Sequence, residues 1–244
     1  MEILYGLLGK NISYSFSLNY FNQKFKLLNF EKYQYKNFDI QNIEEIKEVL
    51  SNNSNLKGLN VTIPYKESII PYLDKISKKA KKIGAVNCIK ISKKGKLKGY
   101  NTDWYGFYKT IIPYRLENQK ALIFGTGGAS KAVQFALKKL NIKYLVVSRN
   151  PNKKQLSYKD ITENDIKKFT ILINCTPLGT FPDVNNCISI PYNCVTEKHI
   201  AYDLIYNPEI SKFLKKCKHQ GSKIINGYDM LVAQAELSFE IWNK

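Results

Sequence analysis

A glycine-rich turn between a buried strand and a helix constrains this chain more than any other feature. The apolar run Ala121–Phe124 is typical of a buried strand, and it leads directly into Gly125-Thr126-Gly127-Gly128-Ala129-Ser130. Residues 132–140 then have helical spacing, and Tyr144–Val147 reads as the next strand. Glycines at such a turn let the backbone approach a pyrophosphate, which the N-terminus of the helix favours. The segment predicts a dinucleotide-binding domain of Rossmann type, although Ser130 stands where the motif has its third glycine. A turn without a ligand is the alternative.

The residues after the second strand indicate which nucleotide this domain would bind. An NAD site places Asp or Glu about 20 residues past the turn, where it accepts a hydrogen bond from the ribose 2′-OH. This chain has Ser148-Arg149-Asn150 there, with Lys153 and Lys154 close behind and no acid. A guanidinium at this place suits a 2′-phosphate. We therefore predict NADP over NAD, and the alternative is a solvated arginine in a basic loop.

The first hundred residues alternate between strand-like and helix-like patterns. Ile3–Leu8 is apolar and ends at a glycine, whereas Leu18, Phe21, Phe25 and Leu28 recur at helical spacing. Leu56–Ile63 reads as a strand closed by Pro64. The second sheet is expected to gain strands at Ile171–Ile173 and, as its last strand, Ile200–Leu204, and the tail from Gly227 to Trp242 is apolar at helical spacing. The fold class is α/β.

The charge balance is strongly basic, with 38 basic and 20 acidic residues and a formal net charge of +18. All the basic residues except Arg115 and Arg149 are lysine. One interpretation is an anionic partner such as nucleic acid or a membrane surface. The other is that lysine has accumulated at solvated positions, of which runs such as Lys78–Lys82 are typical. Nucleic-acid surfaces more often use the planar fork of arginine, so we expect no nucleic-acid partner.

The remaining composition excludes several classes of protein. A chain with 44% hydrophobic and 13% aromatic residues can bury a core, so it is not disordered. No apolar run approaches the roughly 20 residues of a membrane span, and no basic region opens the chain as in a secretory signal. The five cysteines are scattered without CxxC spacing, and there are only two histidines. We expect reduced thiols, a cytoplasmic location and no metal site.

Four short polar motifs stand where predicted strands end, and each has an ordinary structural interpretation. Ser15 and Ser17 precede a helix, and Ser17 fits a capping role as well as a ligand role. Lys66 closes the segment Asn60–Lys66 but is one of many lysines, and Asp103 in the fourth motif could equally be a helix cap. The third motif is Gly84-Ala85-Val86-Asn87.

Taken together, the motifs resemble those of the shikimate dehydrogenases, which reduce 3-dehydroshikimate in aromatic amino-acid synthesis. The matching segments, in family order and spanning essentially the whole chain, are GLNVTIPYK (58–66), GAVN (84–87), GYNTDWYG (99–106), GTGGAS (125–130), NCTPLG (174–179) and GYDMLVAQA (227–235). The resemblance implies an N-terminal α/β substrate domain over residues 1–103 and a Rossmann-type NADP-binding domain over 104–226. It also implies a C-terminal helix, 227–244, that returns to the first domain.

The departures from the family pattern are concentrated in two places. In the opening motif, Asn11, Tyr14 and Leu18 replace a proline, a histidine and a second proline, which puts the rigidity of this loop in question while both serines survive. The chain is also short between Arg149 and Ile171, where the family has room for a helix. We expect a short irregular connection there.

The resemblance implies a role for each matching residue. Lys66 would protonate the oxygen that is reduced, and Asp103 would hold the same hydroxyl and orient the lysine. The substrate would be bound by Ser15, Ser17, Thr62, Asn87, Asp103, Tyr206 and Gln234, the two serines on its carboxylate. The cofactor would be bound by Gly125, Thr126, Gly127, Gly128, Ala129, Ser148, Arg149, Asn150, Lys153, Leu204 and Gly227, the last two lining the nicotinamide pocket.

Two alternatives to an NADP-dependent shikimate dehydrogenase stay open. One is a quinate/shikimate dehydrogenase with relaxed cofactor use, against which the missing acid and the paired serines count. The other is an inactive basic binding protein on a Rossmann scaffold, which would have no reason to keep both Lys66 and Asp103. The partner is expected to be a small molecule, and the chain a monomer or homodimer.

Overall fold

The structure is a computed structural model that describes residues 2–13, 15–114 and 116–244, and it contains two compact units. The first unit comprises Met1–Thr102 with Ala235–Lys244, and the second comprises Asp103–Gln234. The last helix, α8 (Tyr228–Asn243), therefore contributes its first residues to the second unit and its end to the first.

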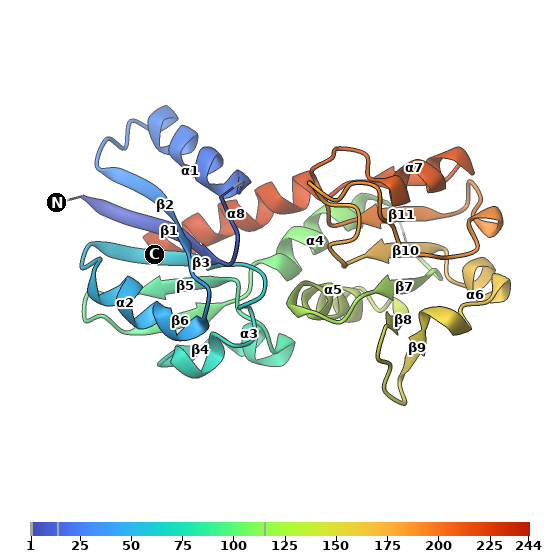
Figure 1. Ribbon diagram of the computed structural model, residues 1–244, viewed down its shortest axis with the longest axis horizontal. Coiled ribbons are helices and arrows are strands. Elements are labelled where there is room, and N and C mark those ends of the chain that lie inside the picture. The colour runs from blue at the N-terminus through green and yellow to red at the C-terminus, as the bar shows by residue number, and fades with distance from the viewer. Residues whose placement is uncertain (1, 14, 115) are drawn as a thin grey trace. The chain divides into compact units, whose positions relative to one another are not determined.

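The first unit is built on a six-stranded mixed sheet (Figure 1). Its strands are β1 (Ile3–Gly9), β2 (Tyr33–Asp39), β3 (Leu56–Val61), β4 (Lys75–Ile76), β5 (Cys88–Ile91) and β6 (Leu97–Tyr100). They lie in the order β2-β1-β3-β5-β6-β4, with β1 parallel to both β2 and β3, and β5 antiparallel to β3 and β6. The predicted strand at Ile3–Leu8 is confirmed, and the one predicted at Leu56–Ile63 is confirmed as far as Val61.

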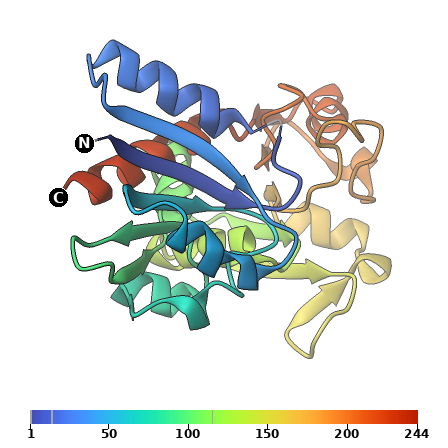
Figure 2. The ribbon, with the colours of Figure 1, turned by 60° about the vertical axis from the view of Figure 1, so that its left-hand side comes forward.

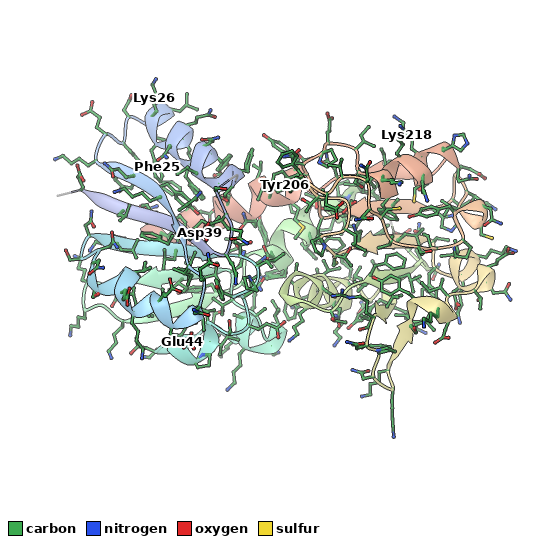
Figure 3. The ribbon with its side chains drawn as sticks, viewed as in Figure 1. Phe25, Lys26, Asp39, Glu44, Tyr206 and Lys218 are labelled. Atoms are coloured by element: carbon green, nitrogen blue, oxygen red, sulfur yellow. The ribbon has the colours of Figure 1, made fainter. Side chains whose placement is uncertain are left out.

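Helices cover both faces of this sheet, as Figure 2 shows. On one face α1 (Phe16–Leu27) and the end of α8 pack over a core that includes Tyr5, Phe21 and Phe25. On the other face lie α2 (Ile46–Ser51) and α3 (Lys78–Ile83). Figure 3 shows the two sides of α1: the buried Phe25 points toward the sheet and its neighbour Lys26 points away from it. The spacing of apolar residues along α1 is what places its phenylalanines on the sheet.

Trp242 fixes the end of α8 to the first sheet. Its side chain is only 5% exposed, stacks on Tyr5 with ring centroids 4.7 Å apart, and donates a hydrogen bond from Nε1 to the carbonyl of Ile89 at 3.0 Å. The indole lies against Gly58, where an added Cβ would come within 2.3 Å of Nε1. A glycine is therefore required at position 58 for the tryptophan to seat.

The second unit is built on a six-stranded parallel sheet. Its strands are β7 (Lys120–Phe124), β8 (Lys143–Ser148), β9 (Gln155–Ser157), β10 (Ile171–Asn174), β11 (Ile200–Asp203) and β12 (Lys223–Ile225). They lie in the order β12-β11-β10-β7-β8-β9 with every pair parallel. Counted from β7, this is the 3-2-1-4-5-6 order of a Rossmann fold, and the strand order reverses between β7 and β10.

Helices cover both faces of the second sheet as well (Figure 1). On one face α4 (Asp103–Ile111), α5 (Gly128–Lys139) and the start of α8 surround Tyr202 and Ile123. On the other face α6 (Glu163–Lys168) and α7 (Lys212–His219) pack over Phe124 and Leu172. Lysines occupy the outer sides of such helices: Lys218 of α7 points away from its unit (Figure 3). Single-turn 3-10 helices complete both units at Ile43–Glu45, Ile70–Tyr72, Ile112–Tyr114, Tyr158–Asp160 and Tyr192–Cys194.

The structure corrects two predictions in the second unit. The segment between Arg149 and Ile171 is not an irregular connection, since it holds β9 and the short α6, which begins with a Thr162–Asp165 capping box. The strand β11 is not the last of the sheet, because β12 follows it. Elements of three to six residues escape a search for periodicity, which needs a longer run to show a face.

The five cysteines are free thiols, as predicted. Across the described ranges, the helices include none that is long and apolar enough to cross a membrane.

Candidate active site

Ser15 and Ser17 open helix α1, and Ser15 rather than Ser17 caps it. Ser15 is the N-cap: its backbone is extended, with φ −65° and ψ 130°, and its Oγ accepts a hydrogen bond from the N–H of Ser17 at 3.2 Å. The expectation that Ser17 caps the helix is therefore wrong. Ser17 lies inside the first turn, 8% exposed. Tyr14, the replacement for the family histidine, lies outside the described residues.

A buried polar network connects Ser17 to Asn87 across the first unit. Burial raises the pKa of Tyr35 well above its ordinary value, an effect that its hydrogen bond with Ser17 partly offsets. The Tyr35 hydroxyl donates to Asn60 Oδ1 at 2.8 Å, and Asn60 Nδ2 donates to Ser238 Oγ at 3.0 Å. Ser238 comes from α8, so the C-terminal helix is part of this network.

The network ends on the side chain of Asn87, which Thr102 orients. Ser238 Oγ lies 3.1 Å from Thr102 Oγ1, and Asn87 Nδ2 donates to the same Oγ1 at 2.9 Å. Asn87 Oδ1 accepts from the N–H of Thr102 at 2.6 Å, which fixes which way the amide faces. Asn87 is 2% exposed and Thr102 is fully buried. Buried, mutually satisfied polar groups of this kind hold a side chain in one orientation.

Lys66 and Thr62 lie directly beyond the end of β3, and both are partly buried. The N–H of Thr62 donates to the carbonyl of Leu8 at 2.9 Å, which ties it to β1. The carbonyl of Lys66 accepts from the N–H of Val86 at 2.7 Å. Lys66 is therefore attached by its backbone to the residue that precedes Asn87.

These predicted substrate residues gather at one edge of the first sheet. The serines follow β1, and Thr62 and Lys66 follow β3. Asn87 precedes β5, which runs antiparallel to β3, so it lies at the same edge. A lysine, hydroxyls and a carboxamide at one sheet edge are suited to a small ligand rich in oxygen atoms.

Asp103 and Gln234 belong to the second unit. Asp103 is the first residue of α4 and is 5% exposed, and Gln234 lies on α8 and is 8% exposed. The two helices pack closely at Gly106, where an added Cβ would lie 2.6 Å from the carbonyl oxygen of Met230 and 3.3 Å from Cβ of Gln234. This contact sets Gln234 beside the first turn of α4, which begins with Asp103.

The glycine-rich turn has the geometry that a phosphate group requires. Gly125 has a φ of +107°, which L side chains rarely adopt, and an added Cβ would lie 3.1 Å from Thr176. Gly127 is the N-cap of the 12-residue α5, and an added Cβ there would meet nothing within 4 Å. The N-terminus of α5, with its unsatisfied N–H groups and positive dipole end, therefore opens onto space. The third glycine is replaced by a fully buried serine, whose Oγ accepts from Gln134 at 3.1 Å.

The segment after β8 presents its arginine to solvent. The Ser148 Oγ accepts from the N–H of Asn150 at 3.2 Å and turns the chain, and Arg149 and Lys153 are exposed. Burial raises the pKa of Tyr158 to about 12, and the nearby Arg149 guanidinium opposes that rise. The sequence Ser148–Lys154 contains no carboxylate that would accept from a ribose 2′-OH.

A buried acid that the sequence analysis missed organises the ends of β10 and β11. Asp203 is fully buried and accepts hydrogen bonds from Asn174 Nδ2 at 3.0 Å, from the N–H of Ile205 at 3.0 Å and from Ser211 Oγ at 2.5 Å. Burial raises the pKa of Asp203 to about 7, against the opposing effect of these donors. Asp203 thereby fixes the loop that carries Leu204 and Tyr206, the latter labelled in Figure 3.

Gly227 packs directly against the backbone of the loop that follows β11. An added Cβ would lie 2.1 Å from the carbonyl oxygen of Leu204, and the Gly227 N–H donates to Ile205 at 2.9 Å. The missing side chain thus admits the backbone of Leu204. That both residues line a nicotinamide pocket stays a prediction.

The predicted cofactor residues lie at the carboxyl edge of the second sheet. The turn at 125–129 follows β7, Ser148 ends β8 and residues 149–150 follow it, and Leu204 follows β11. Ligands of doubly wound sheets bind at this edge, where the strand order reverses. Among the residues that the structure describes, no group of three or more His, Cys, Asp or Glu side chains could hold a metal ion.

The parallel sheet, its strand order and the open glycine turn define the second unit as a Rossmann-type dinucleotide-binding domain. A family model described as the shikimate dehydrogenase substrate binding domain matches residues 7–89 of the first unit. A shikimate dehydrogenase (NADP(+)) of Clostridium botulinum is 40% identical over 249 residues, covering 97% of this chain and 95% of that protein.

Solved structures of the same enzyme have the same fold. A shikimate dehydrogenase crystallised in complex with NADP+ matches with a TM-score of 0.87 at 33% identity, covering 99% of this chain and 90% of that chain. One from Thermus thermophilus, in complex with NADP(H) and shikimate, matches with a TM-score of 0.86 at 28% identity, covering 98% and 93%. This chain belongs to the shikimate dehydrogenase family.

Proposed function

We propose that this protein is an NADP-dependent oxidoreductase that reduces 3-dehydroshikimate to shikimate in the synthesis of aromatic amino acids. The full-length likeness to enzymes of this activity supports the reaction. The observation that carries the proposal is the set of polar side chains at one edge of the first sheet, where Lys66 is tied by its backbone to the segment of Asn87.

The second unit fits NADP. Open space at Gly127 leaves room for a pyrophosphate at the N-terminus of α5, and the exposed Arg149, in a segment without acids, suits a 2′-phosphate. Thr126, Gly128 and Ala129 would place their backbones along the same phosphates, and Ser148, Asn150 and Lys153 would surround the ribose phosphate. When bound, NADPH supplies the hydride for the reduction.

Lys66 has the chemistry of the proton donor. Reduction of a ketone leaves negative charge on its oxygen, and an ammonium group beside that oxygen can stabilise the charge and deliver a proton. In the reverse direction the neutral amine would take the hydroxyl proton. Asp103 would accept a hydrogen bond from the same hydroxyl and orient the lysine.

The other predicted residues would bind the substrate. Ser15 and Ser17 carry hydroxyls that can donate to a carboxylate, and Ser15 can do so while its oxygen accepts from Ser17. Thr62, Asn87 and Gln234 would hold ring hydroxyls. Tyr206 would also contact the substrate.

We also propose a cytoplasmic monomer or homodimer that acts on this small molecule and binds no nucleic acid. The five free cysteines suit a reducing compartment. Lysines such as Lys26 and Lys218 lie on exposed helix faces, as expected for residues that keep their charge in water.

The test follows NADPH formation from shikimate and NADP by its absorbance, with NAD and quinate as the alternative cofactor and substrate. We expect turnover that is fastest with the pair shikimate and NADP. Faster turnover of quinate, or equal efficiency with NAD, would favour the quinate/shikimate dehydrogenase alternative. Absence of turnover, together with salt-dependent binding to DNA or RNA, would favour the inactive binding protein.

A further inference from the structure

The loop that leads from β1 to the two serines is held by one carboxylate. Asp39 ends β2 and pairs with Gly9, the last residue of β1. Its two oxygens accept two successive backbone N–H groups of the loop, Oδ1 from Asn11 at 2.9 Å and Oδ2 from Ile12 at 3.0 Å. A carboxylate that accepts two charge-assisted hydrogen bonds from adjacent peptides fixes both peptide planes.

Ile12 is also held at its carbonyl and its side chain. Asn37, also on β2, donates from Nδ2 to the carbonyl of Ile12 at 3.0 Å, and the N–H of Ser15 donates to that carbonyl at 3.0 Å. The Ile12 side chain is 6% exposed in the core. An added Cβ on Gly9 would lie 2.7 Å from Ile12 and 2.5 Å from Thr62, so this glycine lets the two side chains meet.

The position of Ser15 therefore depends on Ile12, and that of Ile12 depends on Asp39. Asn11 has a φ of +55°, a conformation that asparagine tolerates and proline cannot adopt. This loop thus lacks the restraint that a proline would give the family's opening motif, and hydrogen bonds to β2 restrain it instead. The loop after β1, whose rigidity the sequence puts in question, is therefore held rigid by the neighbouring strand β2.

We propose that Asp39 is a positioning residue for substrate binding: it clamps Asn11 and Ile12 so that Ser15 and Ser17 are held ready for the substrate carboxylate. The proposal rests on the proposed function, because it takes the serines as carboxylate ligands. Asp39 touches the loop backbone and acts through it.

Two variants separate the clamp from the charge of Asp39. In Asp39→Asn the side chain keeps its shape but presents an NH2 group where one of the two loop N–H groups points, so one hydrogen bond is lost. Glu44→Gln removes the same charge from another exposed acid of this unit, which accepts from the Tyr72 hydroxyl; both acids are labelled in Figure 3. Removal of a negative charge alone favours binding of an anionic substrate, whereas loosening the loop weakens it.

The kinetic test compares shikimate with its methyl ester, which lacks the carboxylate charge. We expect Asp39→Asn to raise the KM for shikimate about tenfold, with kcat and the KM for NADP changed less than twofold. The methyl ester cannot bind the serines as an anion. For this substrate the kcat/KM of Asp39→Asn should therefore fall less than twofold from the wild-type value. Glu44→Gln should stay within twofold of the wild type throughout. An unchanged KM for shikimate, or equal losses on the acid and the ester, would overturn the proposal.

A second readout does not depend on activity. Hydrogen exchange of whichever of the Asn11 and Ile12 amides loses its acceptor should be about ten times faster in Asp39→Asn than in the wild type, and unchanged in Glu44→Gln. If the wild type turned over no shikimate, the proposed function would fail while faster exchange still supported the clamp. Unchanged exchange in Asp39→Asn would refute the clamp whatever the activity.

Discussion

Seating of Trp242 against Gly58 predicts a strong energetic coupling between these two positions. The indole is 5% exposed and bonds to the Ile89 carbonyl. A buried tryptophan removes about 200 Å² from water, which at about 25 cal/mol per Å² amounts to about 5 kcal/mol. Trp242→Ala should therefore lower the free energy of unfolding by about 4 kcal/mol, within the range seen for such truncations.

Gly58→Ala perturbs the same contact from the other side. Its new methyl group would lie 2.3 Å from the indole nitrogen, so the ring has to move. Overpacking of this kind costs about 2 kcal/mol. In a Trp242→Ala background the methyl group enters the space that the ring has left, so the same change should cost less than about 0.5 kcal/mol.

Urea unfolding of the two single variants and the double variant measures this coupling. Gly99→Ala is the matched control, because an added Cβ at this strand glycine would crowd Leu73 and Val86 and does not involve Trp242. We expect the cost of Gly99→Ala to be equal in both backgrounds, as for independent sites. Additive effects of Gly58→Ala and Trp242→Ala would refute the reasoning.

Two further predictions concern the second unit. Arg149→Ala should raise the KM for NADP at least tenfold, because an ion pair with the 2′-phosphate is lost, and leave the KM for NAD within twofold. Steady-state kinetics with both cofactors measure this. An unchanged KM for NADP would show that the arginine is merely solvated. Asp203→Asn should change how stability depends on pH. Because burial raises the pKa of Asp203 from 3.8 to about 7, the folded state holds this proton more tightly. The stability that this tightly held proton contributes is complete below pH 4 and is lost as the pH rises through 7. Relative to the wild type, the free energy of unfolding of the variant should therefore increase by about 2–4 kcal/mol between pH 4 and pH 8, as measured in urea titrations. A constant difference across that range would contradict it.

The sequence predicts the long elements of this fold well and the short ones poorly. The strands β1, β7 and β8 are apolar runs, and α1 repeats its aromatic residues at helical spacing, so local patterns suffice. The three-residue β9 and β12 form only because neighbouring strands offer them hydrogen bonds, which no local pattern records.

The candidate site divides in the same way. Ser15, Lys66 and Asp103 stand in short motifs whose order along the chain is readable. Asp39 and Ser238 were not found, because their partners are distant in sequence: Asn60 and Ser238 are 178 residues apart. Side chains that orient others through such contacts become visible only when the chain is folded.

We propose that Lys66 delivers the proton to the reacting oxygen in the reduction and takes it from the hydroxyl in the oxidation. Steady-state oxidation of shikimate by NADP should show that Lys66→Ala lowers kcat by at least about a hundredfold, with the KM for shikimate within threefold of the wild type. Lys82→Ala, which removes an exposed lysine of the same unit, should leave both values unchanged. A raised KM with an unchanged kcat would instead make Lys66 a binding residue and contradict the claim.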